Sequence, residues 1–406
     1  MNDFTDIRSI LVIKLRNIGD VLLTVPAIRA LKESFPRARI CALVNSGTED
    51  MLSLNPLVEE VIVLPRDAKK GTGKGARLAG EIKFVRGLRK KGFDMTVDLT
   101  GGDRAAIAGF STGARYRLGY DPAGKGFKGK KYLYTHLAPV AEAGTHTVLR
   151  DLGLLRHFGI GTKDLTVDIY NSREDEEYVD RLLREKVFLK GEKPFVHLHP
   201  VSRWLFKCWT DKGVAEIIKR FMETGLSVVV TSGPEERELN KVRSILGLLP
   251  IKPADLSGLL TLKQLAALSR RAALFFGVDS APMHIAAAVG VPVVALFGPS
   301  GAFDWGPWDN SAIKGCLLKA PGAGRTGTID DEKNLSPCSP YPMRSGIQRF
   351  GRNTVIQLDW DCIPCGKDGC GGTKKSDCLS ALEPADVWEI LKGSVEEVLS
   401  GRDGLP

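Results

Sequence analysis

The sequence has no apolar run long enough to cross a bilayer, and its first residues do not have the pattern expected of a cleavable leader. A spanning helix needs roughly 18 consecutive apolar residues, and no stretch of the 406-residue chain approaches this length. The opening segment, MNDFTDIRSILVIKLRN, has early acids, a short apolar run and no small-residue cleavage site. These absences predict a cytoplasmic protein.

Cysteine is sparse, and eight in a chain of this length do not make a disulfide scaffold. Four of them gather in "CIPCGKDGCGGTKKSDC", at Cys362, Cys365, Cys370 and Cys378. Four thiolates separated by such short intervals could enclose a structural zinc. The alternatives are reduced structural thiols or a local disulfide. We expect one of these alternatives, and no resident metal or other cofactor.

The glycine-rich turn of dinucleotide-binding enzymes is also missing. No G-x-G-x-x-G follows either of the two opening strands, which counts against a nicotinamide-dependent oxidoreductase. A nucleic-acid-binding protein with a four-cysteine zinc module is a more remote alternative. It would interleave aromatic and basic residues, whereas the most basic segment, residues 66–91, contains only Phe84 as an aromatic residue. We expect no nucleic-acid partner.

Positive charge is concentrated rather than spread. Residues 66–91 contain ten lysines and arginines against two acids within a net charge of +9. A second basic cluster comprises Lys125, Lys128, Lys130 and Lys131. A glycine-rich basic loop of this kind suits an anionic partner, either phosphate groups or an acidic membrane surface. A solvated surface is the alternative.

Apolar, β-branched runs alternate with amphipathic stretches, which predicts βα units around parallel sheets. Helices are expected after Gly19, over residues 81–92, and over 172–187 with Ser172 and Asp175 as a capping pair. The expected strands are residues 9–15, 39–44, 59–64, 93–101 and 116–120, and then 195–202, 226–234, 273–280 and 291–299.

This length predicts two domains, because domains usually have about 100 to 200 residues. The turn "LKGEKP" breaks the charged helix before the strand series begins again, so we expect an N-terminal domain over residues 1–175 and a second over 190–380. Residues 298–359 look irregular. Residues 384–400 recover a helical period that should pack on a core through Val387, Ile390, Leu391, Val395 and Leu399. The expected fold is α/β with two successive open sheets, whose ligands bind beyond the strands' carboxyl ends.

The strongest local motif is "GVDSAPMHIAAAVGVPVVALFGPS", residues 277–300. Asp279 and Ser280 suit a helix N-cap, and Gly290 suits the end of that helix. A helix that begins at a strand's carboxyl end offers free N–H groups and a positive dipole end to a phosphate, and His284 could add a donor. The alternative is a capped structural turn with a packed histidine.

Two further loops follow strands of the second half. In "HLHPVSRWLFKCW", Ser202 offers a hydroxyl and Lys207 a cation. In "TSGPEERE", Glu235 or Glu236 could accept hydrogen bonds from a ribose hydroxyl pair, although helix starts favour acids in any case. Together the three loops combine a hydroxyl, a cation, a carboxylate and a helix N-terminus, which suits a nucleotide diphosphate.

The N-terminal stretch "VIKLRNIGDVLLTVPAI" reads as a strand that leads into a helix with one carboxylate, Asp20, at its beginning. The helix N-terminus and the nearby Lys14 and Arg16 favour the ionised form of this side chain. A capping carboxylate is the alternative to a chemical role.

The pairing of "IGDVLLTVPAIRALK" with the 277–300 motif resembles glycosyltransferase family 9, the ADP-heptose:lipopolysaccharide heptosyltransferases. The segments "GVDSAPMH" and "FDWGPW" are most similar to the heptosyltransferase III branch. The resemblance implies a glycosyltransferase B-type fold, in which two Rossmann-like domains face each other across a cleft. It also implies inverting transfer of heptose from ADP-heptose to the lipopolysaccharide inner core. Another sugar nucleotide or glycan acceptor within the same family is the alternative.

The resemblance also implies residue roles. Asp20 would be the general base that takes a proton from an acceptor hydroxyl. Cations and backbone donors would stabilise the departing ADP without a metal. The donor site would comprise Ser202, Lys207, Glu235 or Glu236, Leu260, Asp279, Ser280, Ala281 and His284. The acceptor side would use Lys14, Arg16 and Arg104, and the basic segment would dock on the anionic inner-membrane surface. "DSAP" stands where the family commonly has Asp-Thr-Gly, so the donor sugar stays open.

Overall fold

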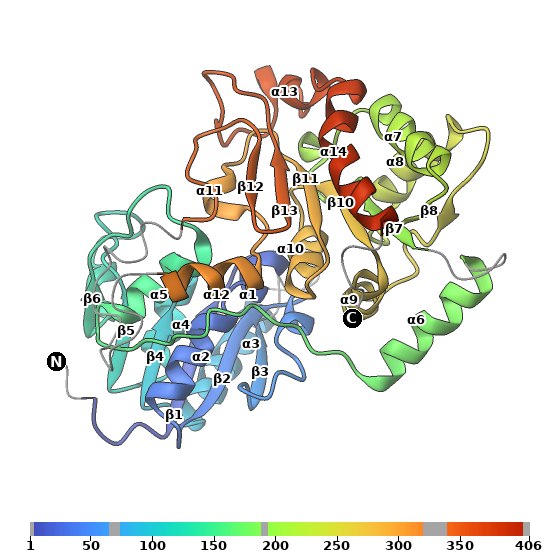
Figure 1. The fold of residues 1–406 in the computed structure, drawn as a ribbon. Helices are drawn as coiled ribbons and strands as arrows, with labels where there is room; N and C mark the ends of the chain where they lie inside the picture. The colour runs from blue at the N-terminus through green and yellow to red at the C-terminus, as the bar shows by residue number, and fades with distance from the viewer. Residues whose placement is uncertain (1–3, 65–73, 188–193, 320–338, 401–406) are drawn as a thin grey trace. The chain divides into compact units, whose positions relative to one another are not determined.

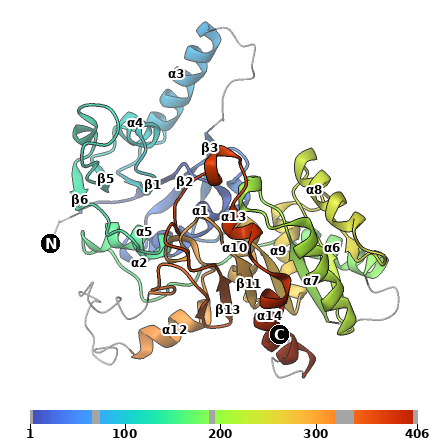
Figure 2. The same cartoon turned by 90° about the horizontal axis from the view of Figure 1, so that it is seen from above.

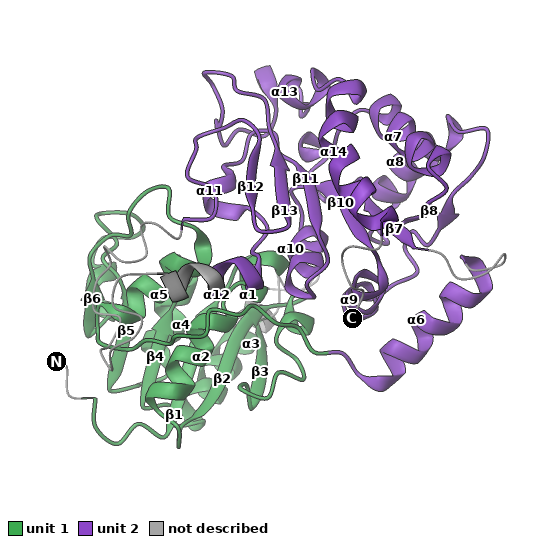
Figure 3. Cartoon of the chain, viewed as in Figure 1, with its two compact units in different colours: residues 1–170, 317–337 green, residues 171–316, 338–406 purple. Residues whose placement is uncertain are grey.

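The chain divides into two units, each built on its own sheet (Figure 3). The computed structural model describes residues 4–64, 74–187, 194–319 and 339–400. Unit 1 contains residues 1–170 and 317–337, and unit 2 contains residues 171–316 and 338–406. Both sheets are made mainly of parallel strands separated by helices, as the alternating pattern of the sequence predicts.

The sheet of unit 1 has the strand order β3-β2-β1-β4-β5-β6 (Figure 1). All six residues of β1 are buried, as expected for a central parallel strand covered on both faces. Five of the strands lie where the sequence predicts them, whereas the three-residue β6 is too short to show a periodicity. The strands are β1 (Ser9–Lys14), β2 (Arg39–Asn45), β3 (Glu60–Leu64), β4 (Met95–Asp98), β5 (Tyr116–Tyr120) and β6 (His136–Ala138).

Helices cover both faces of this sheet. Leu88 of α3 and Ala105 and Ala108 of α4 pack against Leu11 and Ile13 of β1, and Figure 2 shows α3 and α4 as neighbours. The strand order reverses between β1 and β4, so a ligand crevice is expected at their carboxyl ends. The helices are α1 (Ile18–Leu22), α2 (Val25–Ser34), α3 (Lys74–Lys90), α4 (Asp103–Ser111) and α5 (Thr147–Arg156), with short 3-10 turns η1 (Glu49–Met51) and η2 (Lys130–Leu133).

The helix expected over residues 81–92 is confirmed, but α3 begins at Lys74, within the stretch that was expected to be a glycine-rich loop. Alanine, leucine, lysine and arginine dominate this stretch and favour helix strongly enough to accommodate its glycines. Arg66, Lys69 and Lys70 lie outside the described residues. No helix in the described part of the chain has the length and apolar character needed to cross a membrane.

The sheet of unit 2 has the order β12-β13-β11-β10-β7-β8-β9, in which only β12 is antiparallel to its neighbour. The strand order reverses between β7 and β10, which defines a second expected ligand crevice. The strands are β7 (Phe195–His199), β8 (Ser227–Val230), β9 (Ala254–Asp255), β10 (Leu274–Val278), β11 (Val293–Leu296), β12 (Gln348–Phe350) and β13 (Asn353–Ile356).

The prediction that residues 298–359 are irregular is wrong in part. This segment contains α11 (Ala302–Trp305), α12 (Asn310–Lys319) and the hairpin of β12 and β13. All four residues of β13 are buried beside β11. A four-residue strand is too short to be distinguished from a loop by periodicity, and only its pairing with β11 reveals it. Residues 320–338 lie outside the described part of the chain.

Two cores fill the two faces of this sheet. Residues of α7, α8 and α14 form one core with Val196 and Leu198 of β7, and residues of α6, α9 and α10 form the other with Phe195. The C-terminal helix packs on the first core, as predicted, except that Leu399 is 53% exposed near the end of the helix. The main helices are α6 (Arg173–Lys186), α7 (Asp211–Glu223), α8 (Glu236–Gly247), α9 (Leu262–Arg271), α10 (Ala281–Ala288), α13 (Asp377–Ser380) and α14 (Pro384–Leu399).

Ser172 is the N-cap residue of α6, and Asp175 is its partner in a capping box, as predicted. The expected domain junction after this helix differs from the observed division, which falls after Tyr170. The reason is tertiary: α6 packs on α9, where Asp180 accepts a 2.7 Å hydrogen bond from Arg271. An amphipathic pattern shows that a helix has a buried face but does not show which sheet it covers.

Candidate active site

An ion pair joins the loops that follow β7 and β10 in unit 2. Lys207 ends the short 3-10 turn η3 (Leu205–Lys207), and its Nζ lies 2.6 Å from Oδ2 of Asp279, the first residue after β10. The Asp279 side chain is 6% exposed and that of Lys207 is 23% exposed. Two residues of the predicted donor site, 72 positions apart, are therefore in contact where the strand order reverses.

The predicted phosphate-binding helix, α10, begins directly after Asp279 and Ser280. Ser280 is the N-cap residue of α10, but its Oγ is buried and makes no hydrogen bond within the described chain. Ser280 therefore occupies the predicted N-cap position but makes no side-chain cap hydrogen bond, so its hydroxyl keeps its bonding capacity. Ala281 is the first helical residue, a position that alanine favours. His284 is buried in the same first turn.

The other predicted donor-site residues lie on neighbouring loops. Ser202 is 6% exposed and its Oγ accepts a 3.3 Å hydrogen bond from the Trp204 N–H. Leu260 precedes α9 and is partly buried against the core that includes β10 and α10. Both loops follow strands at the same edge of the sheet, since β7, β9 and β10 are all parallel.

The two glutamates of the turn after β8 differ in their contacts. Glu236 pairs with Arg243, with 2.9 Å between Oε1 and Nη1. Glu235 is the exposed N-cap residue of α8 and forms no ion pair among the described residues. Glu238, which the sequence prediction missed, is buried and accepts a 3.1 Å hydrogen bond from the Gly233 N–H. Burial raises the pKa of Glu238, and this carboxyl group holds the turn in shape.

A buried polar chain beneath this site was also missed. Ser269 Oγ donates to the Leu265 carbonyl at 2.9 Å, so it accepts from Nδ1 of His197, also at 2.9 Å. The Nε2 of His197 then accepts from Thr231, whose Oγ1 accepts from Nδ1 of His199, both at 2.8 Å. This order leaves Nε2 of His199 as an acceptor at the carboxyl end of β7.

Burial keeps both of these histidines neutral. It lowers the pKa of His197 well below 6.5, with His199 adding a smaller effect, and it lowers the pKa of His199 to about 3. The signal in the sequence was the presence of two histidines within the apolar run "FVHLH". A polar side chain in a fully buried strand requires buried partners, but the sequence does not identify them.

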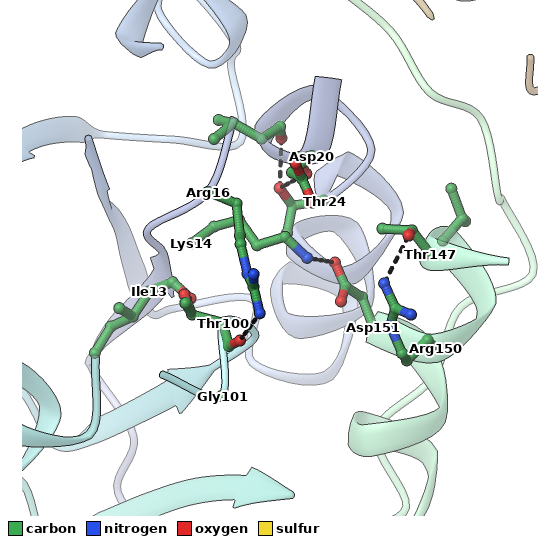
Figure 4. Close-up of polar contacts among 12 residues, drawn as sticks. Ile13, Lys14, Arg16, Asp20, Thr24, Thr100, Gly101, Thr147, Arg150 and Asp151 are labelled. Carbon is green, nitrogen blue, oxygen red and sulfur yellow. Dashed lines mark hydrogen bonds and ion pairs between the residues drawn. The ribbon is translucent and has the colours of Figure 1, made fainter. Parts of the chain in front are cut away.

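Asp20 lies in α1, immediately beyond β1 in unit 1 (Figure 4). It is 8% exposed, and its Oδ2 accepts a 3.2 Å hydrogen bond from the Asn17 N–H, so the capping role considered from the sequence is present. The bond occupies one oxygen, and Oδ1 accepts no hydrogen bond within the described chain. The carboxylate therefore retains an oxygen that could take a proton.

Lys14 makes an ion pair that the sequence prediction did not include. The lysine ends β1, and its Nζ donates a 2.6 Å hydrogen bond to Oδ2 of Asp151 in α5, with both side chains 3% exposed (Figure 4). Burial raises the pKa of Asp151, and Lys14 opposes that effect. Lys14 is thus held by a buried acid beneath the loop. The sequence did not reveal this because Asp151 is 137 positions away.

Arg16 and the loop after β4 are tied together. The Arg16 guanidinium donates a 3.0 Å hydrogen bond to the Thr100 carbonyl (Figure 4). Thr100 Oγ1 accepts a 2.7 Å hydrogen bond from the Leu15 N–H. Asp98 supports this loop by accepting hydrogen bonds from Thr100 N–H at 2.8 Å and Tyr134 O–H at 2.6 Å. The loops beyond β1 and β4 thus form one assembly. Arg104, at the start of α4, is exposed beside it.

The four clustered cysteines are free thiols. Cys362 is exposed and Cys378 is buried, and burial raises the pKa of the Cys378 thiol to about 11. Within the described ranges, no group of three or more histidine, cysteine, aspartate or glutamate side chains is arranged to hold a metal ion. Cys316 and Cys338 are outside the side chains that the structure describes.

Comparison with known proteins identifies the family. Residues 82–328 match glycosyltransferase family 9 (heptosyltransferase). The chain is 34% identical to lipopolysaccharide heptosyltransferase 3 of Escherichia coli (strain K12), over 74% of this chain and 85% of that protein.

Two solved structures share the fold. One is a family 9 glycosyltransferase from Veillonella parvula, with a TM-score of 0.72 and 20% identity, covering 97% of this chain and 98% of that one. The other is E. coli ADP-heptose lps heptosyltransferase II, with a TM-score of 0.68 and 19% identity, covering 96% and 99%. They confirm the predicted fold class, two Rossmann-like units of the glycosyltransferase B type. The chain belongs to glycosyltransferase family 9 and is a heptosyltransferase-family enzyme, as its motifs predict.

Proposed function

We propose that this chain transfers heptose from ADP-heptose to the core of lipopolysaccharide, with inversion at the anomeric carbon. The observation that carries the proposal is the Lys207–Asp279 pair beside the unbonded Ser280 hydroxyl, at the strand-order reversal of unit 2. This is where an α/β sheet binds a ligand, and the combination of cation, hydroxyl and helix N-terminus suits a diphosphate.

In this proposal, Lys207 turns from Asp279 toward the diphosphate, and the Ser202 and Ser280 hydroxyls and the Ala281 N–H donate to its oxygens. The helix dipole of α10 adds to the same field, and His284 adds a further contact from the first turn. These groups neutralise the charge that develops on the departing ADP without a metal. Asp279 meets the donor sugar or its phosphate region.

The nucleoside half of ADP would lie on the neighbouring loops. Glu235 is favoured over Glu236 for the ribose hydroxyls, because Glu236 is already paired with Arg243. The Leu260 backbone meets the adenine. The Nε2 of His199 offers an additional acceptor to a substrate hydroxyl at this edge of the sheet.

The chemical step uses Asp20 as the general base. Oδ1 of Asp20 takes the proton of an acceptor hydroxyl while the hydroxyl oxygen bonds to the anomeric carbon. The bond from that carbon to the diphosphate oxygen breaks, and ADP leaves with the electron pair on the opposite face. Attack opposite the leaving group inverts the configuration. A carboxylate suffices because the hydroxyl becomes acidic only as the new bond forms.

The acceptor would be held by cations of unit 1. Arg16 and Arg104 lie on the joined loops beyond β1 and β4, and they suit phosphates or carboxylates of the lipopolysaccharide core. Lys14 is assigned a positioning role, since its ammonium is engaged with Asp151. The exposed basic residues of α3 would attract the chain to the cytoplasmic side of the inner membrane. These are Lys83, Arg86, Arg89 and Lys90.

The test is ADP release from ADP-heptose in the presence of truncated core oligosaccharides, with the product analysed by mass spectrometry. Nuclear magnetic resonance then compares the anomeric configuration of the donor and product. We expect release that depends on the acceptor, a product one heptose heavier, and an inverted linkage. Turnover of a different sugar nucleotide in preference to ADP-heptose would refute the assigned donor, and a retained configuration would refute the mechanism.

A further inference from the structure

Exposed aromatic and basic side chains gather along α4 in unit 1. Ile107 and Phe110 are 48% and 50% exposed on this helix, and Phe127 and Tyr132 are 41% and 74% exposed on the segment that follows β5. Lys125, Lys128 and Lys131 alternate with these aromatic residues and are exposed too. We call these seven residues the α4 surface.

Lys130 ties one end of this segment to α4. Its Nζ donates a 2.6 Å hydrogen bond to the Gly101 carbonyl and lies 3.2 Å from Oδ1 of Asp103, the first residue of α4. Lys130 is buried by these contacts, so the prediction that it joins an anion-binding cluster is wrong. Gly126 fits closely here, because a Cβ at this position would lie 2.1 Å from Asp103 Oδ1.

Arg117 connects the other end of the segment with α4. Its Nε donates a 2.7 Å hydrogen bond to the Leu133 carbonyl, next to Tyr132, while its guanidinium lies 5.3 Å from the Phe110 ring centroid. The segment is thus held against both the first and the last turn of α4. The segment that carries Phe127, Tyr132 and the exposed lysines is therefore held against α4, which carries Ile107 and Phe110.

The composition of this surface indicates its partner. Residues 122–135 contain no acidic residue and four lysines. Three of these lysines are exposed. Aromatic side chains with a cation beside them suit the headgroup region of a bilayer, where the ring is apolar and its surroundings are polar. Ile107 offers no ring to stack on a base, so an aliphatic and aromatic surface of this kind suits lipid better than a nucleic acid.

We propose that the α4 surface docks on an anionic lipid bilayer, with Phe127 and Tyr132 entering the headgroup region and the three exposed lysines contacting acidic lipids. Lys130 connects the segment that carries this surface to Gly101 and Asp103, next to the Thr100 carbonyl that accepts a hydrogen bond from Arg16. A docked chain would therefore hold the candidate acceptor loops close to the bilayer. The membrane contact does not depend on the identity of the transferred sugar, and it differs from the attraction proposed for α3.

The test measures binding of the full chain to vesicles of phosphatidylethanolamine with phosphatidylglycerol, and to vesicles of phosphatidylcholine alone. Phe127→Ser/Tyr132→Ser removes the apolar contact, and Lys125→Gln/Lys128→Gln/Lys131→Gln removes the charge. Leu248→Ser/Ile251→Ser is the matched control, since Leu248 and Ile251 are 52% and 69% exposed in unit 2. Thermal unfolding checks that every variant is folded.

We expect wild-type binding to the anionic vesicles only, at least tenfold weaker binding for both α4-surface variants, and unchanged binding for the control. ADP release with a lipid-free core oligosaccharide should stay at the wild-type rate in all of them. Equal vesicle binding by the wild-type chain and the α4-surface variants would overturn the proposal, as would binding to RNA but not to vesicles. A chain that binds vesicles but releases no ADP would refute the proposed function alone.

Discussion

Lys207 donates a 2.6 Å hydrogen bond to Asp279, and this bond connects the loops beyond two adjacent parallel strands. The lysine is held near the helix N-terminus of α10 by a carboxylate from the same motif. Ordering a long lysine side chain costs up to about 2 kcal/mol in lost rotamer freedom. Asp279 orders the lysine side chain before a ligand binds, so Lys207 would turn toward a diphosphate from a position beside the first residues of α10.

Replacing Lys207 by methionine should weaken ADP binding. A hydrogen bond to a charged group contributes about 1.5 to 3 kcal/mol, which corresponds to roughly a 10- to 150-fold change in Kd. Isothermal titration calorimetry measures the change. Lys241→Met is the control, because Lys241 also forms an ion pair and its side chain is 21% exposed. Equal weakening in both variants would count against a specific role for Lys207.

Replacing Asp20 by asparagine should remove turnover while leaving ADP affinity nearly unchanged. General-base catalysis typically contributes about a hundredfold or more, and asparagine keeps an acceptor for the Asn17 N–H. The matched control is Asp175→Asn in α6, since Asp175 also accepts a 3.2 Å hydrogen bond from the residue three positions earlier. Steady-state ADP release measures both. If Asp20→Asn behaves like the control, Asp20 is only a capping residue.

Lys14→Met should strongly destabilise the chain, because it leaves the carboxyl group of Asp151 buried without its partner. Breaking one side of a buried ion pair typically costs about 3 to 5 kcal/mol. The double variant Lys14→Met/Asp151→Leu should recover much of this loss. The control is Arg173→Met, since the Arg173–Glu177 pair is largely exposed and contributes little. Urea unfolding measures all three, and a Lys14→Met midpoint close to wild type would contradict the prediction.

The buried histidines predict an acid-sensitive fold. Burial lowers the pKa of His199 from 6.5 to about 3, so below about pH 6.5 the unfolded chain binds a proton that the folded chain does not. The free energy of unfolding therefore keeps its full value, as far as His199 is concerned, above this pH. It decreases as the pH falls toward 3, because the unfolded chain is protonated first. His199→Asn keeps a donor for Thr231 but does not titrate.

Melting temperatures of wild type and His199→Asn, measured across this pH range, provide the comparison. The carboxyl groups that also titrate there are common to both proteins and largely cancel in the difference. We expect the wild type to lose stability more steeply as the pH falls. Parallel curves would show that the protonation of His199 does not contribute to the loss of stability at low pH.

Much of the fold was readable from the sequence, because parallel strands such as β1 and β10 are continuous apolar runs bounded by turns. The strands β6, β9 and β13 were missed because two to four residues carry no detectable period. The unit to which α6 belongs was also missed. That assignment depends on Arg271 and Asp180, which come together only after α9 is folded.

The sequence by itself determined the family, the α/β class and the short motifs around Asp20 and Asp279, because local order and apolar periodicity are encoded in consecutive residues. Only the tertiary structure decided which distant groups meet. Lys14 pairs with Asp151, and Lys207 pairs with Asp279. His199 belongs to a series of buried hydrogen bonds that ends at the Leu265 carbonyl. The physical reason is that a buried charge or polar group must find a partner inside the fold. Three-dimensional packing determines which partner that is, and the spacing of residues along the chain does not show it.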